Sequence, residues 1–144
     1  MSKKIILSEL VEAFDNSNKN YKAIIYVSLD GSPRAIEKLV KNPAFARLGF
    51  AIMTVNDTHL CFYLLDNYRF SLIIEGRVIL PYTAIKKLRV RRFLIWKTLK
   101  IQFLNNDRKY KVNIGMARKA LKIGSQEEHI RGMLNHFKEK GLFY

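Results

Sequence analysis

The stretch of sequence that decides the fold covers residues 86–114 and reads KKLRVRRFLIWKTLKIQFLNNDRKYKVNI. Apolar and polar side chains alternate along it in three successive runs, as they do in strands with one buried and one open face. The run Asn105-Asn-Asp107 favours a turn between the second and third runs. If the three strands form an antiparallel meander, their basic side chains share one outer surface. The residues predicted to form it are Lys87, Arg89, Arg91, Lys100, Lys109 and Lys111.

Four further runs rich in β-forming residues precede this stretch. They are separated by residues that favour turns, such as Asp30-Gly-Ser-Pro33 and the pair Asn56-Asp57. Glu75-Gly76 interrupts the fourth run, where we expect a bulge or a second tight turn. With the three later strands, the sequence predicts about seven antiparallel strands. The four earlier ones are predicted at residues 22–29, 47–55, 58–65 and 69–80.

Helices are indicated by apolar side chains at helical spacing. Residues 34–41 follow a proline suited to a first helical turn, so a short helix is predicted between the first two strands. Ser125-Gln-Glu-Glu128 matches a capping box and predicts a C-terminal helix with an apolar stripe, which Gly141 ends. Residues 8–14 would form a shorter amphipathic helix within an N-terminal extension, residues 1–20.

The size and composition of the chain favour one domain in a reducing compartment. A length of 144 residues leaves room for one hydrophobic core, so a single domain is expected over residues 1–144. The lone cysteine, Cys61, cannot form an internal disulfide. No apolar run is long enough for a secretion signal or a membrane span. The expected location is the cytoplasm, and any membrane contact would be peripheral, at the inner face.

The formal net charge of +14 comes almost entirely from one part of the chain. Residues 86–122 hold 13 basic residues and one acid, whereas residues 1–85 hold 10 basic and 8 acidic residues. Clustering of this kind favours a binding surface for a polyanion. The alternative interpretation is that lysines and arginines on an open sheet only prevent edge-to-edge aggregation and have no partner.

An apolar tip stands between the first two of the alternating strands. No Gly, Asn, Asp or Pro is available there, so either the turn is apolar and exposed or one long strand bends through it. An exposed tip flanked by cations would suit a membrane interface. Alternatively, its aromatic side chains pack beneath the N-terminal helix or at an oligomer contact. The residues of the tip are Phe93, Leu94, Ile95 and Trp96, and the flanking cations are Arg91, Arg92 and Lys97.

Seven strands followed by one amphipathic helix is the element order of the pleckstrin-homology (PH) superfold, a bent antiparallel barrel or sandwich capped by that helix. Three segments resemble the patterns of its bacterial PH-like and GRAM-like members, of the YokE-like type. The segments are the strand-turn-strand run at residues 51–63, Ile79-Leu-Pro-Tyr-Thr-Ala-Ile85, and the closing hairpin at residues 99–103 and 109–112. The resemblance covers residues 20–140 and implies a mainly β fold with a C-terminal helix.

The resemblance also implies a non-enzymatic binding module that associates with membranes or with other proteins. In the eukaryotic lipid-binding members, a basic motif around the connection between the first two strands contacts the phosphoinositide. Here that connection is a longer insert at residues 32–46, which departs from the motif. The family's headgroup site is therefore not transferred to this chain.

Residues that could carry catalysis or bind a metal are few. His129 and His136 lie two helical turns apart, about 10 Å, which is too far to share a metal without a third element. They are interpreted as partly exposed helix histidines. His59 and Cys61 share one strand face and are interpreted as a sheet histidine beside a core thiol. We expect no enzymatic activity, no cofactor and no bound metal.

Three functions compete. In the first, a PH-like adaptor docks on an anionic lipid surface or on an acidic protein. In the second, the same basic face binds nucleic acid, with aromatic side chains such as Trp96 and Tyr110 stacking on bases. In the third, the chain is a protein-interaction module or a homo-oligomer, and its charge is incidental. The residues expected to contact an anionic partner are Lys87, Arg89, Arg91, Arg92, Lys97, Lys100, Lys109 and Lys111.

Overall fold

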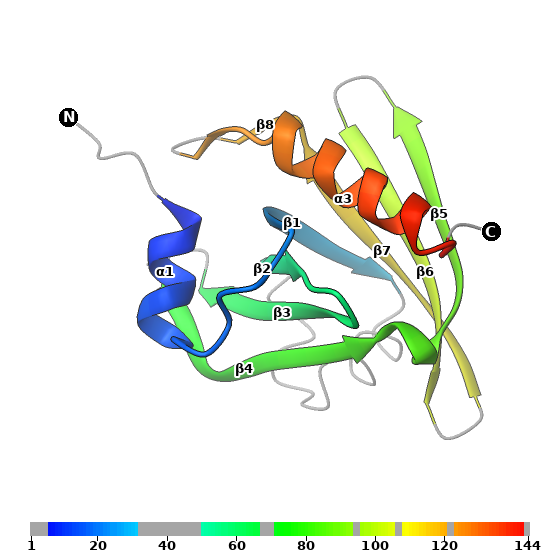
Figure 1. Cartoon of the computed structure of the whole chain (residues 1–144), viewed down its shortest axis with the longest axis horizontal. Coiled ribbons are helices and arrows are strands. Elements are labelled where there is room, and N and C mark those ends of the chain that lie inside the picture. Colours follow the sequence, from blue (N-terminus) through cyan, green and yellow to red (C-terminus); the bar gives the residue numbers. More distant parts are fainter. Residues whose placement is uncertain are drawn as a thin grey trace.

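A computed structural model of the chain describes residues 6–31, 50–66, 71–93, 96–105, 108–120 and 123–142. Seven long strands and two helices make up most of these segments (Figure 1). The helices are α1 (Leu7–Phe14) and α3 (Glu127–Glu139), and Tyr82–Ala84 forms a 3-10 turn. The strands are β1 (Ala23–Gly31), β2 (Phe50–Val55), β3 (His59–Asp66), β4 (Ser71–Pro81), β5 (Ile85–Phe93), β6 (Trp96–Asn105), β7 (Arg108–Ala117), β8 (Lys119–Ala120) and β9 (Gly124–Ser125).

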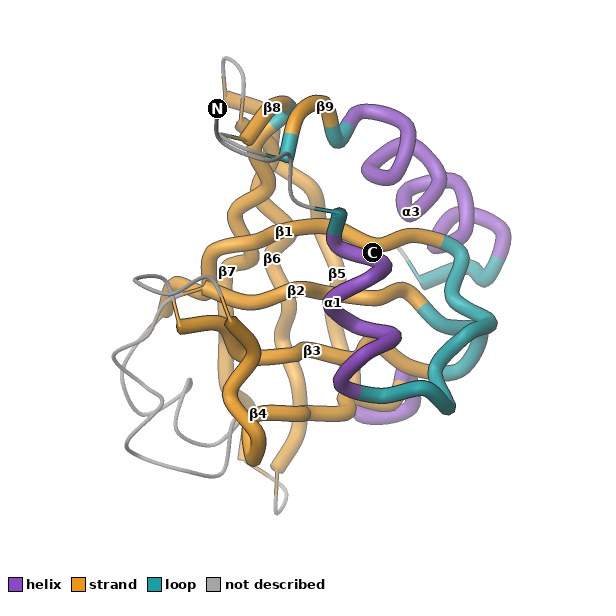
Figure 2. The backbone as a smooth tube through the Cα atoms, turned by 90° about the vertical axis from the view of Figure 1, so that its left-hand side faces the viewer, coloured by secondary structure: helices purple, strands orange, loops and turns teal. Residues whose placement is uncertain are grey.

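The seven long strands form one antiparallel sheet in the order β4-β3-β2-β1-β7-β6-β5. Strands β1–β4 and strands β5–β7 are each a meander of consecutive strands, and the two meanders join where β1 pairs with β7. The strands of the first meander run across those of the second (Figures 1 and 2). The predicted fold class, mainly β with seven antiparallel strands and a C-terminal helix, is confirmed.

The sheet is open, which corrects the barrel part of the predicted barrel or sandwich. Its two edges are β4 and β5, and no pairing joins them within the described strands. The reason lies in the corner between them, because Pro81 ends β4 and the 3-10 turn Tyr82–Ala84 redirects the chain. Proline has no N–H to donate to a neighbouring strand. The N–H of Tyr82 in the following turn bonds to the carbonyl oxygen of Thr58 at 3.0 Å, and β5 then begins as a separate edge of the sheet.

Two expectations concern the first meander. The predicted helix at residues 34–41 lies outside the described residues. The pair Glu75-Gly76 starts no new hairpin, because β4 continues through it and its register against β3 shifts between Tyr63 and Leu65. Of the two alternatives at this point, the bulge is therefore the one that forms.

The ends of α3 differ in part from those predicted. The capping box does not form, because Ser125 lies in β9 and Gln126 takes the N-cap position without a capping hydrogen bond from its side chain. At the other end Gly141 has φ +66°, a left-handed conformation that glycine adopts at low cost, so the predicted end signal is confirmed.

The main core lies between the two meanders and the apolar stripe of α3. Ile130, Met133 and Phe137 of the helix are buried together with side chains of the inner sheet faces, such as Ile25 and Leu99. Helix α3 closes one end of the space between the meanders (Figure 1). The predicted C-terminal helix thus buries the face that its spacing indicates.

Among the described residues, a helix covers the outer face of the first meander but not that of the second. Helix α1 packs Leu7 and Val11 against Ile24, Ile52 and Tyr63, and it lies in front of β1–β3 in Figure 2. These strands therefore carry apolar side chains on both faces and read as continuous apolar runs. None of the described helices covers the outer face of β5–β7, and this is why the side chains of those strands alternate.

Gln126 holds α3 at the place where β1 and β7 separate, because β7 pairs with only the second half of β1. Its amide donates to the carbonyl oxygens of Tyr26 (3.1 Å) and Ala117 (3.0 Å), and its Oε1 accepts the N–H of Tyr26 (2.7 Å). His129 Nδ1 accepts the N–H of Ile24 at 3.2 Å. Side chains of α3 thus replace the missing strand, as buried backbone groups require.

The far end of α3 is tied to the turn between β2 and β3. Asp57 Oδ1 lies 3.0 Å from Lys140 Nζ and 3.8 Å from His136 Nε2. The Lys140 ammonium, which donates a hydrogen bond to the Asp57 carboxylate and attracts it electrostatically, holds the pKa of that carboxyl below its ordinary value. A carboxyl whose pKa is lower in the folded than in the unfolded state stabilises the fold above its unfolded pKa.

We expect the substitution Asp57→Asn to reduce stability near neutral pH and to have no effect in acid. The contribution of Asp57 is present above its ordinary pKa of 3.8 and is lost as the pH falls through the lowered folded value. Urea denaturation of both proteins at about pH 7 and at about pH 2.5 measures the difference. A difference of the same size at both pH values would contradict this assignment.

Candidate functional site

Basic side chains gather on the outer face of β5–β7. The alternation along edge strand β5 turns every second residue outward, and β6 and β7 add cations to the same surface. All of these side chains are exposed except that of Lys100, which is half-buried. The six residues, called the outer basic face below, are Lys87, Arg89, Arg91, Lys100, Lys109 and Lys111.

The pairing register sets the spacing of these charges. Arg89 stands directly opposite Lys100, and Lys87 and Lys111 stand on either side of Gln102 in one row across three strands. Neighbouring strands lie about 4.8 Å apart, and like charges placed directly opposite each other destabilise a sheet by up to about 1 kcal/mol. The fold therefore concentrates the cations of three strands on one surface.

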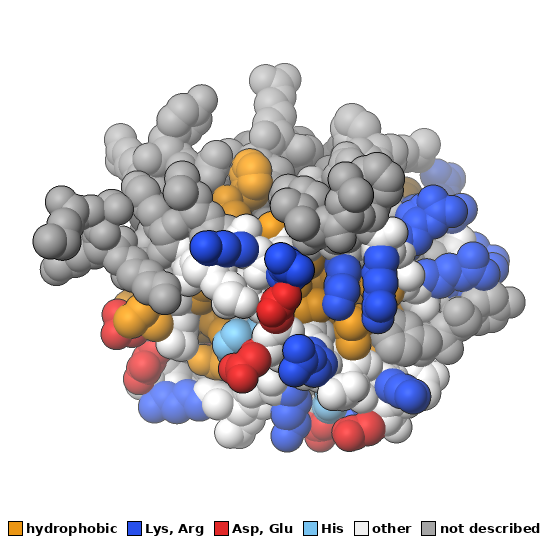
Figure 3. All heavy atoms as spheres, turned by 90° about the horizontal axis from the view of Figure 1, so that it is seen from above, with side chains coloured by type: hydrophobic (Ala, Val, Ile, Leu, Met, Phe, Trp, Pro, Cys, Tyr) orange, Lys and Arg blue, Asp and Glu red, His pale blue; other side chains and the backbone are white. Residues whose placement is uncertain are grey.

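Arg92 and Lys97, which the sequence analysis places in the same binding set, lie on the opposite face of the hairpin. They stand opposite each other in the register, and Lys97 shares its side of β6 with the core residue Leu99. With Arg118 and Arg131 they line a pocket beside α3. Seen from above, basic side chains lie around apolar ones on this side of the molecule (Figure 3). The predicted set thus divides between the outer basic face and this pocket.

The apolar tip is a hairpin at the level of the backbone. Phe93 ends β5, Trp96 begins β6, and the two residues stand opposite each other, so the alternative of one long bent strand is wrong. Leu94 and Ile95, and the side chains of Phe93 and Trp96, lie outside the described residues. The contact expected for this tip stays a prediction.

The histidines and the cysteine occupy structural positions. Cys61 is buried beneath α1, as predicted for a core thiol, and His59 Nδ1 lies 3.0 Å from Thr58 Oγ1. His129 is exposed, but His136 is buried, which corrects the expectation that it would be partly exposed. Within the described ranges, no group of three or more His, Cys, Asp or Glu side chains could hold a metal ion.

A polar cluster that the sequence analysis does not identify joins the loop after α1 to β2 and β3. Asn18 donates to Thr54 Oγ1 (3.0 Å) and to the Tyr63 hydroxyl (2.9 Å), and it accepts from Asn56 (2.8 Å). The Tyr63 hydroxyl donates to Asp15 at 2.8 Å, and burial raises the pKa of Tyr63 above its ordinary value. These groups hydrogen-bond one another, so the cluster anchors the loop.

Two further basic residues of the pocket, Arg118 and Arg131, are not predicted as site residues from the sequence. Arg118 belongs to the basic stretch, but it follows the last alternating run. Arg131 stands beside Ile130, at the margin of the apolar stripe of α3. This position beside the apolar stripe could have predicted that Arg131 lies at the rim of the core. Its place in the same pocket as Arg92 and Lys97 depends on how α3 docks on the sheet.

Comparison with known proteins finds no family model and no curated protein that matches the chain.

Proposed function

We propose that this protein is a non-enzymatic PH-like binding module that docks on an anionic membrane surface through the outer basic face. The observation that carries the proposal is the gathering of six cations on a sheet face that no described helix covers. The order of the strands and the helix that closes one end of the sheet support the PH-like architecture.

The dimensions of this face suit a planar partner. Lys87 and Arg91 lie four residues apart on one strand, about 13 Å, and Lys87 and Lys111 lie two strand spacings apart, about 10 Å. Several cations can therefore reach a flat surface together. Each Lys or Arg contributes about 1 kcal/mol near an anionic leaflet, so six would support reversible binding. None of the helices within the described segments is long and apolar enough to cross a membrane.

The hairpin between β5 and β6 adds a second element to this mode of binding. Arg91 is an exposed member of the outer basic face and stands two residues before the apolar tip. In the proposed docking, the aromatic residues of the tip, Phe93 and Trp96, enter the headgroup region while the basic face lies on the leaflet. An acidic protein partner would use the same cations without the tip.

Co-sedimentation with vesicles tests this function. We expect binding to vesicles that contain phosphatidylglycerol, none to neutral phosphatidylcholine vesicles, and a strong decrease between about 50 mM and 500 mM salt because exposed charges are screened. The same protein titrated with duplex DNA in a gel-shift assay examines the alternative partner, nucleic acid. A shift with DNA, together with no binding to anionic vesicles at low salt, would overturn the membrane proposal.

A further inference from the structure

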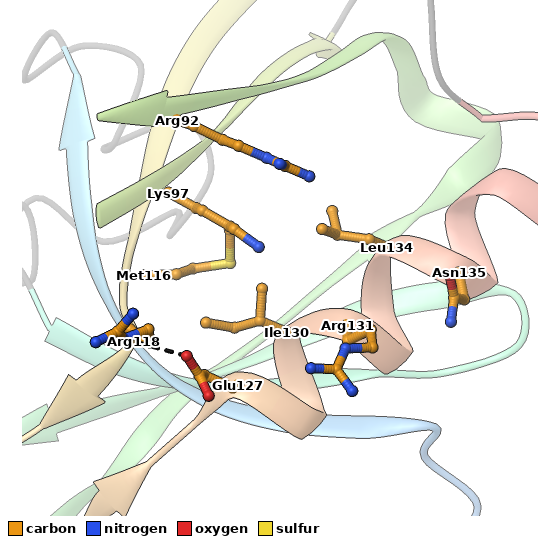
Figure 4. Close-up of a pocket in the computed structure, with 9 residues that line it drawn as sticks. All are labelled: Arg92, Lys97, Met116, Arg118, Glu127, Ile130, Arg131, Leu134 and Asn135. Atoms are coloured by element: carbon orange, nitrogen blue, oxygen red, sulfur yellow. Dashed lines mark ion pairs between the residues drawn. The ribbon is translucent and has the colours of Figure 1, made fainter. Parts of the chain in front are cut away.

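The pocket between the β5–β6 hairpin and α3 is a second cationic site, on the opposite side of the hairpin from the outer basic face. Its volume is about 500 Å³, within the range of small-molecule sites. Its wall is formed by the β5–β6 hairpin, by β7, by the segment after β7 and by α3 (Figure 4). The lining residues are Arg92, Lys97, Met116, Arg118, Glu127, Ile130, Arg131, Leu134 and Asn135.

The floor of the pocket is apolar and packed. Met116 and Ile130 are core residues with at most 2% of their surface exposed, and Leu134 packs against the same core. In Figure 4, Ile130 and Leu134 reach from α3 toward the side chains of Arg92 and Lys97. A ligand lying here would contact apolar side chains already held in place by the fold, so little ordering would accompany its binding.

The rim of the pocket is cationic. Arg92 and Lys97 stand directly opposite each other across the hairpin, and Arg131 of α3 lines the same pocket. Among the described residues, no acidic side chain pairs with these three cations. Among the described lining residues Glu127 is the one acid, and it pairs with Arg118 at 3.1 Å. The positive charge that remains would be neutralised by an anion in the pocket.

We propose that this pocket binds a phosphate that carries an apolar chain. Guanidinium groups match the geometry of phosphate oxygens and bind them through paired hydrogen bonds, which Arg92 and Arg131 can supply with Lys97 as an additional cation. The apolar floor of the pocket would contact the apolar chain of the ligand. The pocket lies on the opposite side of the hairpin from the outer basic face, so this inference goes beyond the proposed membrane docking. The headgroup and first methylenes of an anionic lipid have the required chemistry. A soluble alkyl phosphate shares it.

Isothermal titration calorimetry with three probes tests the chemistry of the pocket. The probes are inorganic phosphate, hexyl phosphate, and dihexanoylphosphatidylglycerol kept below its micelle concentration. We expect both amphiphiles to bind at least about tenfold more tightly than inorganic phosphate, because each buried methylene adds to the affinity. The tighter of the two identifies a lipid or a soluble source. If neither amphiphile binds more tightly than inorganic phosphate, the proposal is wrong.

Charge variants show whether binding occurs in this pocket. The substitution Arg131→Glu, at an exposed position of α3, should weaken the binding of hexyl phosphate by about tenfold or more. Glu127→Gln should tighten the binding of hexyl phosphate, because this acidic side chain is removed from the lining and Arg118 loses its ion pair. The matched control is Arg108→Glu, an exposed position at the opposite end of the hairpin strands. Equal weakening by Arg131→Glu and Arg108→Glu, or no tightening by Glu127→Gln, would overturn the assignment.

The two proposals fail in different ways. Hexyl phosphate involves no bilayer, so a protein that sediments with anionic vesicles but does not bind this probe lacks the pocket site and retains membrane docking. A protein that binds the probe at the pocket but does not sediment with vesicles has the pocket site and lacks membrane docking. Vesicle binding and probe binding of Arg131→Glu, measured side by side, separate these cases.

Discussion

Replacing Gln126 with leucine is expected to lower the free energy of unfolding by about 2–4 kcal/mol, a large part of the total for a domain of this size. The side chain is 2% exposed and makes three hydrogen bonds to the backbone of Tyr26 and Ala117. Leucine has a similar volume but cannot form these three part-buried hydrogen bonds, and each hydrogen bond contributes about 0.5–1.5 kcal/mol. Urea denaturation followed by circular dichroism measures the loss.

The control for this substitution is Gln102→Leu. Gln102 is the half-buried amide on the outer face of β6, and the same chemical change there should alter stability by less than about 1 kcal/mol. If both leucine variants unfold at the same urea concentration, the hydrogen bonds of Gln126 do not hold α3 in place. Gln126→Glu gives a further check, because a carboxylate can accept from Tyr26 but cannot donate to the two carbonyl oxygens.

Reversing two charges of the outer basic face, with Arg89→Glu and Arg91→Glu, is expected to weaken binding to phosphatidylglycerol vesicles by at least about 100-fold at low salt. Each reversal removes one cation and adds one anion, and each charge contributes about 1 kcal/mol near the leaflet. Both positions are exposed on edge strand β5. Vesicle co-sedimentation over a range of lipid concentrations measures the change, and circular dichroism verifies the fold of the variant.

The matched control reverses two charges elsewhere, with Lys19→Glu and Lys22→Glu. Both residues are exposed and precede β1 of the other meander. The net charge of the protein changes by the same amount, so a difference between the two variants reports the location of the charge. Equal binding of the wild-type protein and the Arg89/Arg91 variant would instead show that the charge on this face is incidental, as in the aggregation-blocking interpretation.

The strands of the second meander can be predicted from the sequence because their outer face is open. A strand with one wet and one buried face alternates with a period of two, and Lys87, Arg89 and Arg91 follow that period against Leu88 and Val90. The first meander can be recognised as β structure, but its apolar runs do not show what covers the second face. That information lies in α1, which packs there through contacts distant in sequence.

The pocket and the anchor of α3 could not be predicted for a related reason. Locally, Ser125-Gln-Glu-Glu128 reads as a capping box, but Gln126 is drawn instead to the separated strands β1 and β7. Arg92 and Lys97 can be recognised in the sequence as neighbours of the tip. Because adjacent residues of a strand point to opposite faces, Arg92 can also be placed on the other face from Arg91. The pocket that they share with Arg131 depends on the docking of α3, which no local pattern encodes.

The junction between the two meanders has a consequence for how the chain folds. Within each meander every strand pairs with a neighbour in sequence, so each can form through connections much shorter than the separation of β1 and β7 along the chain. The contact between Val27 of β1 and Met116 of β7 instead closes a loop of about 90 residues, which carries a larger entropic cost and slows the step that makes it. Gln126 bonds to both of these strands, so the C-terminal helix can dock fully only as the two halves meet. Docking of α3 is therefore coupled to the step that joins the two meanders.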